Sequence, residues 1–238
     1  MLALDNIETF RGPAKILHGI SMKIEEGEVV AIVGRNGAGK TTTMESIIGL
    51  LRVKSGQISF RGENITRMSA HSIARRGIGF SPGDCGLFSS LSVQENLEIG
   101  RWHADPKRID KMADGDTLEK RVYSVFPEIE GFKRRNSLKL SGGQRKMVAI
   151  SRAMYLCPSL LLIDEAFEGL APVVISRFRD ALEKIKEMGI TLLMAESNFS
   201  NASLVADRVY VLDRGEVLYE GNPKNAMNDP GVKRVLQG

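Results

Sequence analysis

The sequence predicts an α/β fold in which a core of strands and helices carries an inserted helical lobe. A glycine-rich loop stands between an apolar strand and a helix near the N-terminus, and further apolar strands follow in the last third of the chain. Between them, residues 83–157 show helical patterns and lack strong strands. We therefore expect a single domain over residues 1–238, with 1–82 and 158–238 as its core and 83–157 as the lobe.

Composition limits the classes of protein to consider. The chain has 238 residues, of which 42% are hydrophobic and 26% charged, as in ordinary globular proteins. No apolar run approaches the roughly 18 residues of a membrane span, and the N-terminus lacks a secretory pattern. Cys85 and Cys157 have no metal-type spacing, so we expect a reducing, cytoplasmic location. The net charge of +4 suits a nucleotide or anionic lipid as well as nucleic acid.

Residues 34–41 match the phosphate-loop pattern G-x-x-x-x-G-K-[ST]. Residues 29–33 predict a buried strand before the loop, and a helix is expected to start at Lys40. Such a loop presents backbone N–H groups to phosphates, Lys40 adds a cation for the β and γ phosphates, and the Thr41 hydroxyl is available to Mg²⁺. A glycine turn that merely precedes Lys-Thr is the alternative. The candidate nucleotide-binding residues here are Gly34, Arg35, Asn36, Gly37, Ala38, Gly39, Lys40, Thr41 and Thr42.

The rest of the N-terminal part predicts strands with one short helix. Phe10 falls among the first strands, and its ordinary interpretation is a buried aromatic residue. The expected elements are strands within residues 2–33, a strand at 56–60, a helix at 73–76 and a strand starting at 78–80.

Two capping-box patterns predict helix starts in the lobe. Ser92 with Glu95 begins a helix that runs to about Trp102, and Ser141 with Gln144 begins one that continues to Met154. Two glycines follow Ser141, so the N–H groups there are uncovered and suit an anion, although a plain helix start is the alternative. Between these helices, we expect a loop or short helical pieces at residues 103–116 and a helix at 118–126.

An apolar strand at residues 160–163 leads into Asp164 and Glu165. In a chain with a phosphate loop, Asp164 is placed to hold Mg²⁺, and Glu165 could accept a proton from an attacking water. A solvated strand end is the alternative. The elements expected afterwards are a helix at 173–187, a strand at 191–195, a helix at 200–206, a hairpin of 209–212 with 216–219, and a short helical tail.

Taken in order, the phosphate loop, Leu-Ser-Gly-Gly-Gln at residues 140–144 and the Asp164-Glu165 pair resemble the nucleotide-binding subunit of an ATP-binding cassette transporter. The resemblance covers essentially the whole chain and implies a P-loop NTPase core with an antiparallel β subdomain and an inserted α-helical lobe. Residues 168–172 and the compact tail at 235–238 make the chain similar to the shorter ATPase subunit of branched-chain amino-acid importers. Urea and short-amide importers use closely related subunits.

The resemblance implies hydrolysis of ATP with Mg²⁺, with Glu165 as general base, Lys40 as charge stabiliser, and Phe10 stacked on adenine. A second ATP-binding subunit, of the same or another kind, would be needed, because each subunit closes over its partner's γ-phosphate. The residues implied in that closure are Ser141, Gly142, Gly143 and Gln144. Two membrane permease subunits and, indirectly, an external solute-binding protein are the other implied partners, at the cytoplasmic face of the inner membrane. No nucleic-acid partner is implied.

Three positions depart from the family pattern. The usual glutamine is replaced by Gly83, the usual histidine by Ser197, and an aspartate of a later loop by Ala171. Asp84, beside Gly83, becomes a candidate Mg²⁺ ligand. These changes motivate the hypothesis that this chain's own site binds ATP but hydrolyses it slowly. The alternatives are an ATP-gated binding module with weak hydrolysis and a non-transport cassette ATPase, which usually carries a second cassette or a long coiled-coil insertion.

Overall fold

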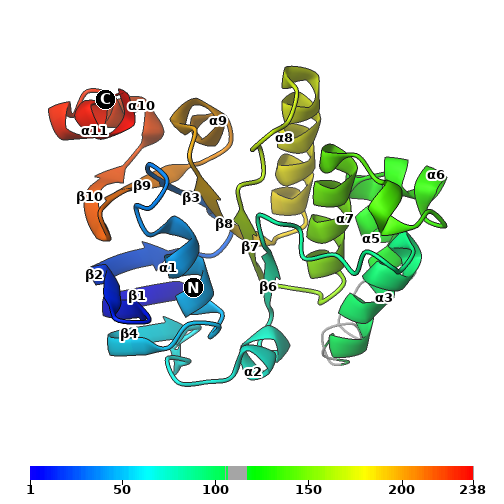
Figure 1. Ribbon diagram of the computed structural model, residues 1–238, viewed down its shortest axis with the longest axis horizontal. Coiled ribbons are helices and arrows are strands. Elements are labelled where there is room, and N and C mark those ends of the chain that lie inside the picture. The colour runs from blue at the N-terminus through cyan, green and yellow to red at the C-terminus, as the bar shows by residue number, and fades with distance from the viewer. Residues whose placement is uncertain (105, 107–116, 238) are drawn as a thin grey trace. The chain divides into compact units, whose positions relative to one another are not determined.

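The structure is a computed structural model that describes the chain except for residues 105, 107–116 and 238. The chain divides into two compact units, and Figure 1 labels most of their helices and strands. Unit 1 comprises Met1–Ile73 and Thr191–Gly238, and unit 2 comprises Ala74–Ile190. The lobe expected at residues 83–157 falls within unit 2.

An antiparallel sheet forms the first part of unit 1, with its strands in the order β2, β1, β4, β5. Their bounds are β1 (Leu2–Arg11), β2 (Ala14–Ile24), β4 (Val53–Phe60) and β5 (Glu63–Asn64). A two-residue turn joins β1 to β2, so that Arg11 pairs with Ala14. Leu2, Leu4 and Ile7 are buried, whereas Asp5 between them is exposed, as expected for a sheet with one covered face. This sheet confirms the predicted antiparallel β region.

The other strands of unit 1 surround β3 (Val29–Val33), whose residues are all buried. β3 pairs in parallel with β8 (Thr191–Glu196) and with β9 (Arg208–Asp213), and β9 pairs antiparallel with β10 (Glu216–Gly221). Fully apolar strands of this kind are typical of sheets covered on both faces. The helices of unit 1 are α1 (Lys40–Ile47), α9 (Phe199–Ser203), α10 (Pro223–Ala226) and α11 (Pro230–Gln237), while α2 (Ala70–Arg75) spans the boundary between the units in the chain.

Unit 2 is mainly helical. Its strands β6 (Ile78–Ser81) and β7 (Leu160–Asp164) pair in parallel. Its helices are α3 (Val93–His103), α5 (Leu118–Val125), α6 (Glu128–Phe132), the 3₁₀ helix Ser137–Lys139, α7 (Gly142–Met154) and α8 (Pro172–Glu187). A Cβ on Gly100 would lie 2.4 Å from the carbonyl oxygen of Arg152, so α3 and α7 approach each other too closely for any other residue at position 100.

Buried Asn96 joins three segments of unit 2. Its side-chain amide donates to the carbonyl oxygens of Phe88 (3.1 Å) and Ser92 (2.9 Å) and to the hydroxyl of Ser137 (2.8 Å). Its amide oxygen accepts a bond of 2.9 Å from the N–H of Phe88. The loop that leads into α3 is thereby attached to the segment that precedes α7.

Most elements follow the sequence-based expectations, but the helix expected at 73–76 begins at Ala70, and helix α6 and strand β5 were not predicted. Both predicted capping boxes are present, at Ser92 and at Ser141. The helix expected at residues 200–206 is shorter and shifted, because Asn198 caps α9 and the N–H of Asp207 already bonds the Val29 carbonyl at the edge of β3. Most of the loop expected at 103–116 lies outside the described residues. No helix in the described part has the length and apolar character to cross a membrane.

Candidate functional site

The phosphate loop connects β3 to α1 in unit 1 and requires glycine at several positions. Gly37 and Gly39 have φ angles of +84° and +107°, in the region that disfavours side chains. A Cβ on Gly34 would lie 2.4 Å from the carbonyl oxygen of Leu212. The glycines therefore permit the backbone path that brings N–H groups to the start of α1, where an anion is favoured.

Lys40 lies folded against its own loop and is only 4% exposed. Its ammonium group donates to the carbonyl oxygens of Gly34 (2.8 Å) and Arg35 (3.2 Å) and to the hydroxyl of Ser197 (2.9 Å). The cation is thus held at the loop by neutral oxygen atoms, which charged phosphate oxygens can replace.

Ser197, which follows β8, is joined to the phosphate loop. Its hydroxyl accepts from Lys40 and donates to the amide oxygen of Asn36 at 2.9 Å. The parallel pairing of β3 with β8 places Val33 opposite Glu196, so the residues that follow these strands are neighbours. The structure therefore brings together three of the sequence-predicted site residues, although a catalytic role for Ser197 stays a prediction.

Arg11 contacts α1, the helix that follows the phosphate loop, and the sequence did not predict this contact. It donates to the Thr42 hydroxyl (3.3 Å) and forms an ion pair with Glu45. Thr42 is one of the candidate nucleotide-binding residues, so the end of β1 reaches the first turn of α1. The only sequence signal is the position of Arg11 directly after Phe10.

Phe10 is half-buried and lines a pocket of about 630 Å³ in unit 1. The pocket is also lined by Gly12, Arg52, Val53, Lys54 and Arg67. Its three basic residues are exposed, and none of them has an ion-pair partner in the described part of the chain. None of the lining residues belongs to the phosphate loop, so stacking of Phe10 on adenine stays a prediction.

The two carboxylates expected after β7 lie in unit 2. Asp164 ends the strand and is 6% exposed, whereas Glu165 adopts a left-handed backbone conformation with φ +52°. Such a conformation costs a non-glycine residue on the order of 1–3 kcal/mol and needs support from its surroundings. Lys146 supplies part of that support, because its ammonium group donates to the Glu165 carbonyl oxygen. A hydrogen bond that protonated Glu168 donates to the Glu165 side chain, together with the negative charge of Glu165, raises the pKa of Glu168.

The loop after β6 lies beside these carboxylates. A Cβ on Gly83 would stand 3.7 Å from a carboxylate oxygen of Glu165 and 3.8 Å from one of Asp164. Position 83 therefore faces the carboxylates, but glycine offers no side chain to contact them. Asp84 is exposed, and burial raises the pKa of the neighbouring Cys85 thiol. A structural role for Cys85 fits this better than a reactive thiolate.

Ser141, Gly142, Gly143 and Gln144 begin α7. The Ser141 hydroxyl accepts from the Gln144 N–H (3.3 Å), and the Gln144 side chain accepts from the Ser141 N–H (3.0 Å). Ser141 and Gly142 are exposed, and neither glycine has a side chain to cover the helix start. The segment can therefore receive an anion from outside this chain.

The residues available for Mg²⁺ are hard oxygen donors. No group of three or more His, Cys, Asp or Glu side chains in the described residues could hold a metal ion by itself. Mg²⁺ at phosphate sites is usually bound by one or two protein oxygens together with substrate phosphates and water. The hydroxyl of Thr41 in unit 1 and the carboxylate of Asp164 in unit 2 are each an oxygen donor of this kind, and a joint role in binding Mg²⁺ stays a prediction.

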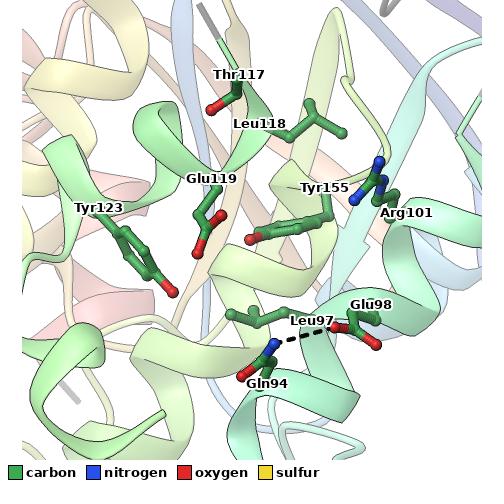
Figure 2. Close-up of a pocket in the computed structure, with 9 residues that line it drawn as sticks. All are labelled: Gln94, Leu97, Glu98, Arg101, Thr117, Leu118, Glu119, Tyr123 and Tyr155. Atoms are coloured by element: carbon green, nitrogen blue, oxygen red, sulfur yellow. Dashed lines mark hydrogen bonds between the residues drawn. The ribbon is translucent and has the colours of Figure 1, made fainter.

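A second pocket, of about 300 Å³, lies in unit 2 among α3, the start of α5 and the residue after α7 (Figure 2). It is lined by Gln94, Leu97, Glu98, Arg101, Thr117, Leu118, Glu119, Tyr123 and Tyr155. Figure 2 shows Glu119 between the two tyrosines. Tyr155 is 6% exposed, and burial raises its pKa to about 12. Its hydroxyl has no hydrogen-bond partner among the described residues, so it is available to a group that enters the pocket.

Comparison with known proteins agrees with this geometry. Residues 17–168 match the family model described as ABC transporter. The high-affinity branched-chain amino acid transport ATP-binding protein BraG of Pseudomonas aeruginosa is 32% identical over 238 residues, which cover 100% of both chains. The lipopolysaccharide export system ATP-binding protein LptB of Haemophilus influenzae is 32% identical over 100% of this chain and 97% of its own.

Solved structures show the same similarity. The ADP conformation of MJ1267, an ATP-binding cassette of an ABC transporter, has a TM-score of 0.85 at 28% identity and covers 100% of this chain and 98% of that one. The dimeric post-hydrolysis state of the ATP-binding cassette MJ0796, bound to ADP and Pi, has a TM-score of 0.78 at 26% identity, over 94% and 99% of the two chains.

The fold and the phosphate loop therefore define a P-loop ATPase of the cassette type, and the chain belongs to the ABC transporter family. Within that family it is the ATP-binding and ATP-hydrolysing subunit of a transporter.

Proposed function

We propose that the chain energises an importer of branched-chain amino acids or of a related small polar solute such as urea or a short amide. The observation that carries this proposal is the similarity to BraG, which extends over the full length of both chains. Residues 168–172, which resemble the shorter subunit of such importers, give further support.

The similarity to LptB is of the same strength and makes export of a lipidic substrate the rival. To discriminate between import and export, the chain is purified with the permease subunits encoded beside it, and the complex is reconstituted in proteoliposomes. ATP-dependent accumulation of radiolabelled leucine or urea, in the presence of the matching solute-binding protein, is the expected result. Absence of uptake together with ATP-dependent extraction of lipopolysaccharide would overturn the proposal.

The proposed chemistry is hydrolysis of ATP to ADP and phosphate. The amides of residues 34–42 bind the triphosphate, and Lys40 exchanges its bonds to Gly34 and Arg35 for phosphate oxygens. Glu165 accepts the proton of the attacking water. Mg²⁺, with Thr41 and Asp164 as its proposed protein ligands, supplies neutralisation of the phosphate charge when bound. Asp84 is kept as a further candidate ligand.

A second ATP-binding subunit completes each site in this proposal. The exposed start of α7 provides the surface that would meet the partner's nucleotide, through Ser141, Gly142, Gly143 and Gln144. The dimeric cassette MJ0796 supports an arrangement in pairs. Whether this chain pairs with itself or with another subunit can be measured by the mass of the purified complex with and without MgATP.

The permease subunits are proposed to contact unit 2, at the cytoplasmic face of the membrane. The pocket of Figure 2 supports this, since the hydroxyl of Tyr155, which lines the pocket, has no hydrogen-bond partner within the described part of the chain. Substitution of Tyr155 by Phe should weaken association with the permease without a change in MgATP binding. A salt-sensitive affinity for DNA or RNA would instead favour the non-transport alternative.

The site that includes this chain's phosphate loop is proposed to hydrolyse ATP slowly, because Gly83 offers no side chain toward Glu165 and Ser197 cannot carry a positive charge. In a heterodimer, Glu165→Gln should then leave most of the ATPase activity of the pair. Near-total loss would contradict the asymmetry. Ser197→His should raise turnover if a missing imidazole limits the rate. Negligible turnover of the partnered chain would favour an ATP-gated binding module.

A further inference from the structure

Helix α7 carries two basic side chains that bind main-chain carbonyl groups of other segments of unit 2. Lys146 donates to the carbonyl oxygen of Glu165. One turn and a half further along, Arg152 donates to the carbonyl oxygens of Cys85 (3.1 Å) and Gly86 (2.8 Å). The same helix thus supports the residue after β7 and the loop after β6.

Each of the carbonyls bound by these two side chains belongs to a residue with a left-handed backbone. The φ angles are +52° for Glu165, +67° for Cys85 and +50° for Gly86. Non-glycine residues rarely adopt this region, so an external hydrogen bond helps to keep them there. The direction of the Glu165 carboxylate depends on this backbone conformation, since rotation of the peptide unit would reorient the side chain.

Lys146 lies five residues after Ser141 in a continuous helix, which corresponds to about 7.5 Å along the axis. A helix transmits a displacement of its first turn to its second turn, because successive hydrogen bonds join them. Contact of a ligand with Ser141 and movement of the Lys146 ammonium group are therefore mechanically linked.

We propose that Lys146 is a positioning residue for hydrolysis, which holds Glu165 through its main-chain carbonyl and connects its orientation to the start of α7. This inference rests on the proposed role of Glu165 as general base. It extends that role. In this proposal Lys146 contacts neither the nucleotide nor the attacking water, yet it sets the geometry of Glu165, which contacts the water. A small misplacement of a catalytic group is enough to lower a rate by about 10- to 100-fold.

The test compares Lys146→Met with Lys139→Met in the full-length chain, paired with an ATP-binding subunit whose own phosphate loop is inactivated, so that only hydrolysis of the ATP held by this chain's phosphate loop is measured. Lys139 is exposed and has no side-chain bond to any described residue, so the control makes the same change of charge just before α7. We expect Lys146→Met to lower kcat by about 10-fold or more, with KM and the affinity for MgATP changed less than about twofold. Lys146→Gln, which keeps an N–H donor, should recover part of kcat. The control should resemble the unchanged protein.

A double variant separates positioning from general loss of structure. If Lys146 acts through Glu165, Lys146→Met should cause no further loss of hydrolysis in a Glu165→Gln background. The proposal would be overturned if the losses of activity caused by the two substitutions were fully additive. It would also be overturned if the kcat of Lys146→Met stayed within about twofold of the unchanged protein. If Lys146→Met does not fold, as judged by its melting temperature, Lys146→Gln decides by the same criteria.

The proposed role of Glu165 and that of Lys146 can fail separately. In this own-site measurement, full activity of Glu165→Gln alone would refute the general base and leave the bond from Lys146 without a catalytic purpose. An inactive Glu165→Gln with a fully active Lys146→Met would refute the positioning role alone.

Discussion

The ammonium nitrogen of Lys40 lies 2.9 Å from the hydroxyl oxygen of Ser197, although the two residues are 157 positions apart in the chain. They meet because β3 and β8 run in parallel as neighbours and end at the same edge. In this arrangement, Ser197 competes with phosphate oxygens for one of the three donors of Lys40.

Replacement of Ser197 by Ala should therefore tighten the binding of MgATP. Loss of one competing hydrogen bond is worth about 1 kcal/mol, or roughly fivefold in the dissociation constant. A fluorescent ATP analogue titrated against the variant measures this. Ser200→Ala is the matched control, since Ser200 is exposed and its hydroxyl has no partner among the described residues. Weaker binding would mean that Ser197 contacts the nucleotide itself.

Replacement of Lys40 by Ala should weaken MgATP binding by roughly 10- to 100-fold, because charge-assisted bonds to phosphate contribute about 1.5–3 kcal/mol. The same titration provides the measurement. Lys224→Ala removes an exposed cation of unit 1 away from the phosphate loop and should have little effect. If Lys40→Ala bound MgATP as tightly as the unchanged protein, the phosphate loop would not be the nucleotide site.

Replacement of Asn96 by Ala should lower the free energy of unfolding by about 3 kcal/mol, since it leaves buried groups without their hydrogen bonds. Urea denaturation measures the change. Gln94→Ala, an exposed position on the same helix, should change stability by less than about 0.5 kcal/mol. Equal effects of the two substitutions would show that Asn96 does not join the segments as described.

Replacement of Arg208 by Met should destabilise the protein in a pH-dependent way. Burial alone would raise the pKa of Glu28, but hydrogen bonds from Arg208 and from the Glu25 amide lower it below its ordinary value of 4.5. A carboxylate with a lowered pKa stabilises the fold above its unfolded pKa, and this contribution is lost as pH falls through the folded value.

The difference in unfolding free energy between Arg208→Met and the unchanged protein should accordingly be about 2 kcal/mol at neutral pH and become smaller near pH ~3. Urea denaturation at both pH values checks this. Arg61→Met, which removes an exposed ion pair with Glu26, provides a control with a much smaller effect. A difference that stays constant with pH would show that Arg208 stabilises the fold by packing rather than by charge.

Features encoded locally could be predicted from the sequence. The phosphate loop has the expected strand and helix on its two sides, because apolar β-branched residues precede it and glycines permit its turns. The helix starts at Ser92 and Ser141 are confirmed, because each capping box involves residues only three positions apart.

Contacts between distant segments could not be predicted. The bonds from Arg11 to Thr42 and from Lys146 to Glu165 depend on how strands and helices pack, and no pattern in one stretch of sequence reveals them. The predicted end of α9 was wrong for the same reason, since the bond between the Asp207 N–H and β3 determines where the chain leaves the helix. Likewise, no sequence pattern predicted that three exposed basic residues line the pocket of Phe10.

The first two turns of α7 make different contacts, which under the proposed pairing would let the helix time hydrolysis. Its exposed first residues, Ser141 and Gly142, would meet the nucleotide of a neighbouring subunit, while the Lys146 ammonium group donates to the Glu165 carbonyl oxygen. Under the proposed pairing, arrival of the neighbour's ATP would set the moment at which this chain's own carboxylate becomes ready. Hydrolysis of the two ATP molecules would then be coupled rather than independent, and the coupling would require no separate regulatory domain.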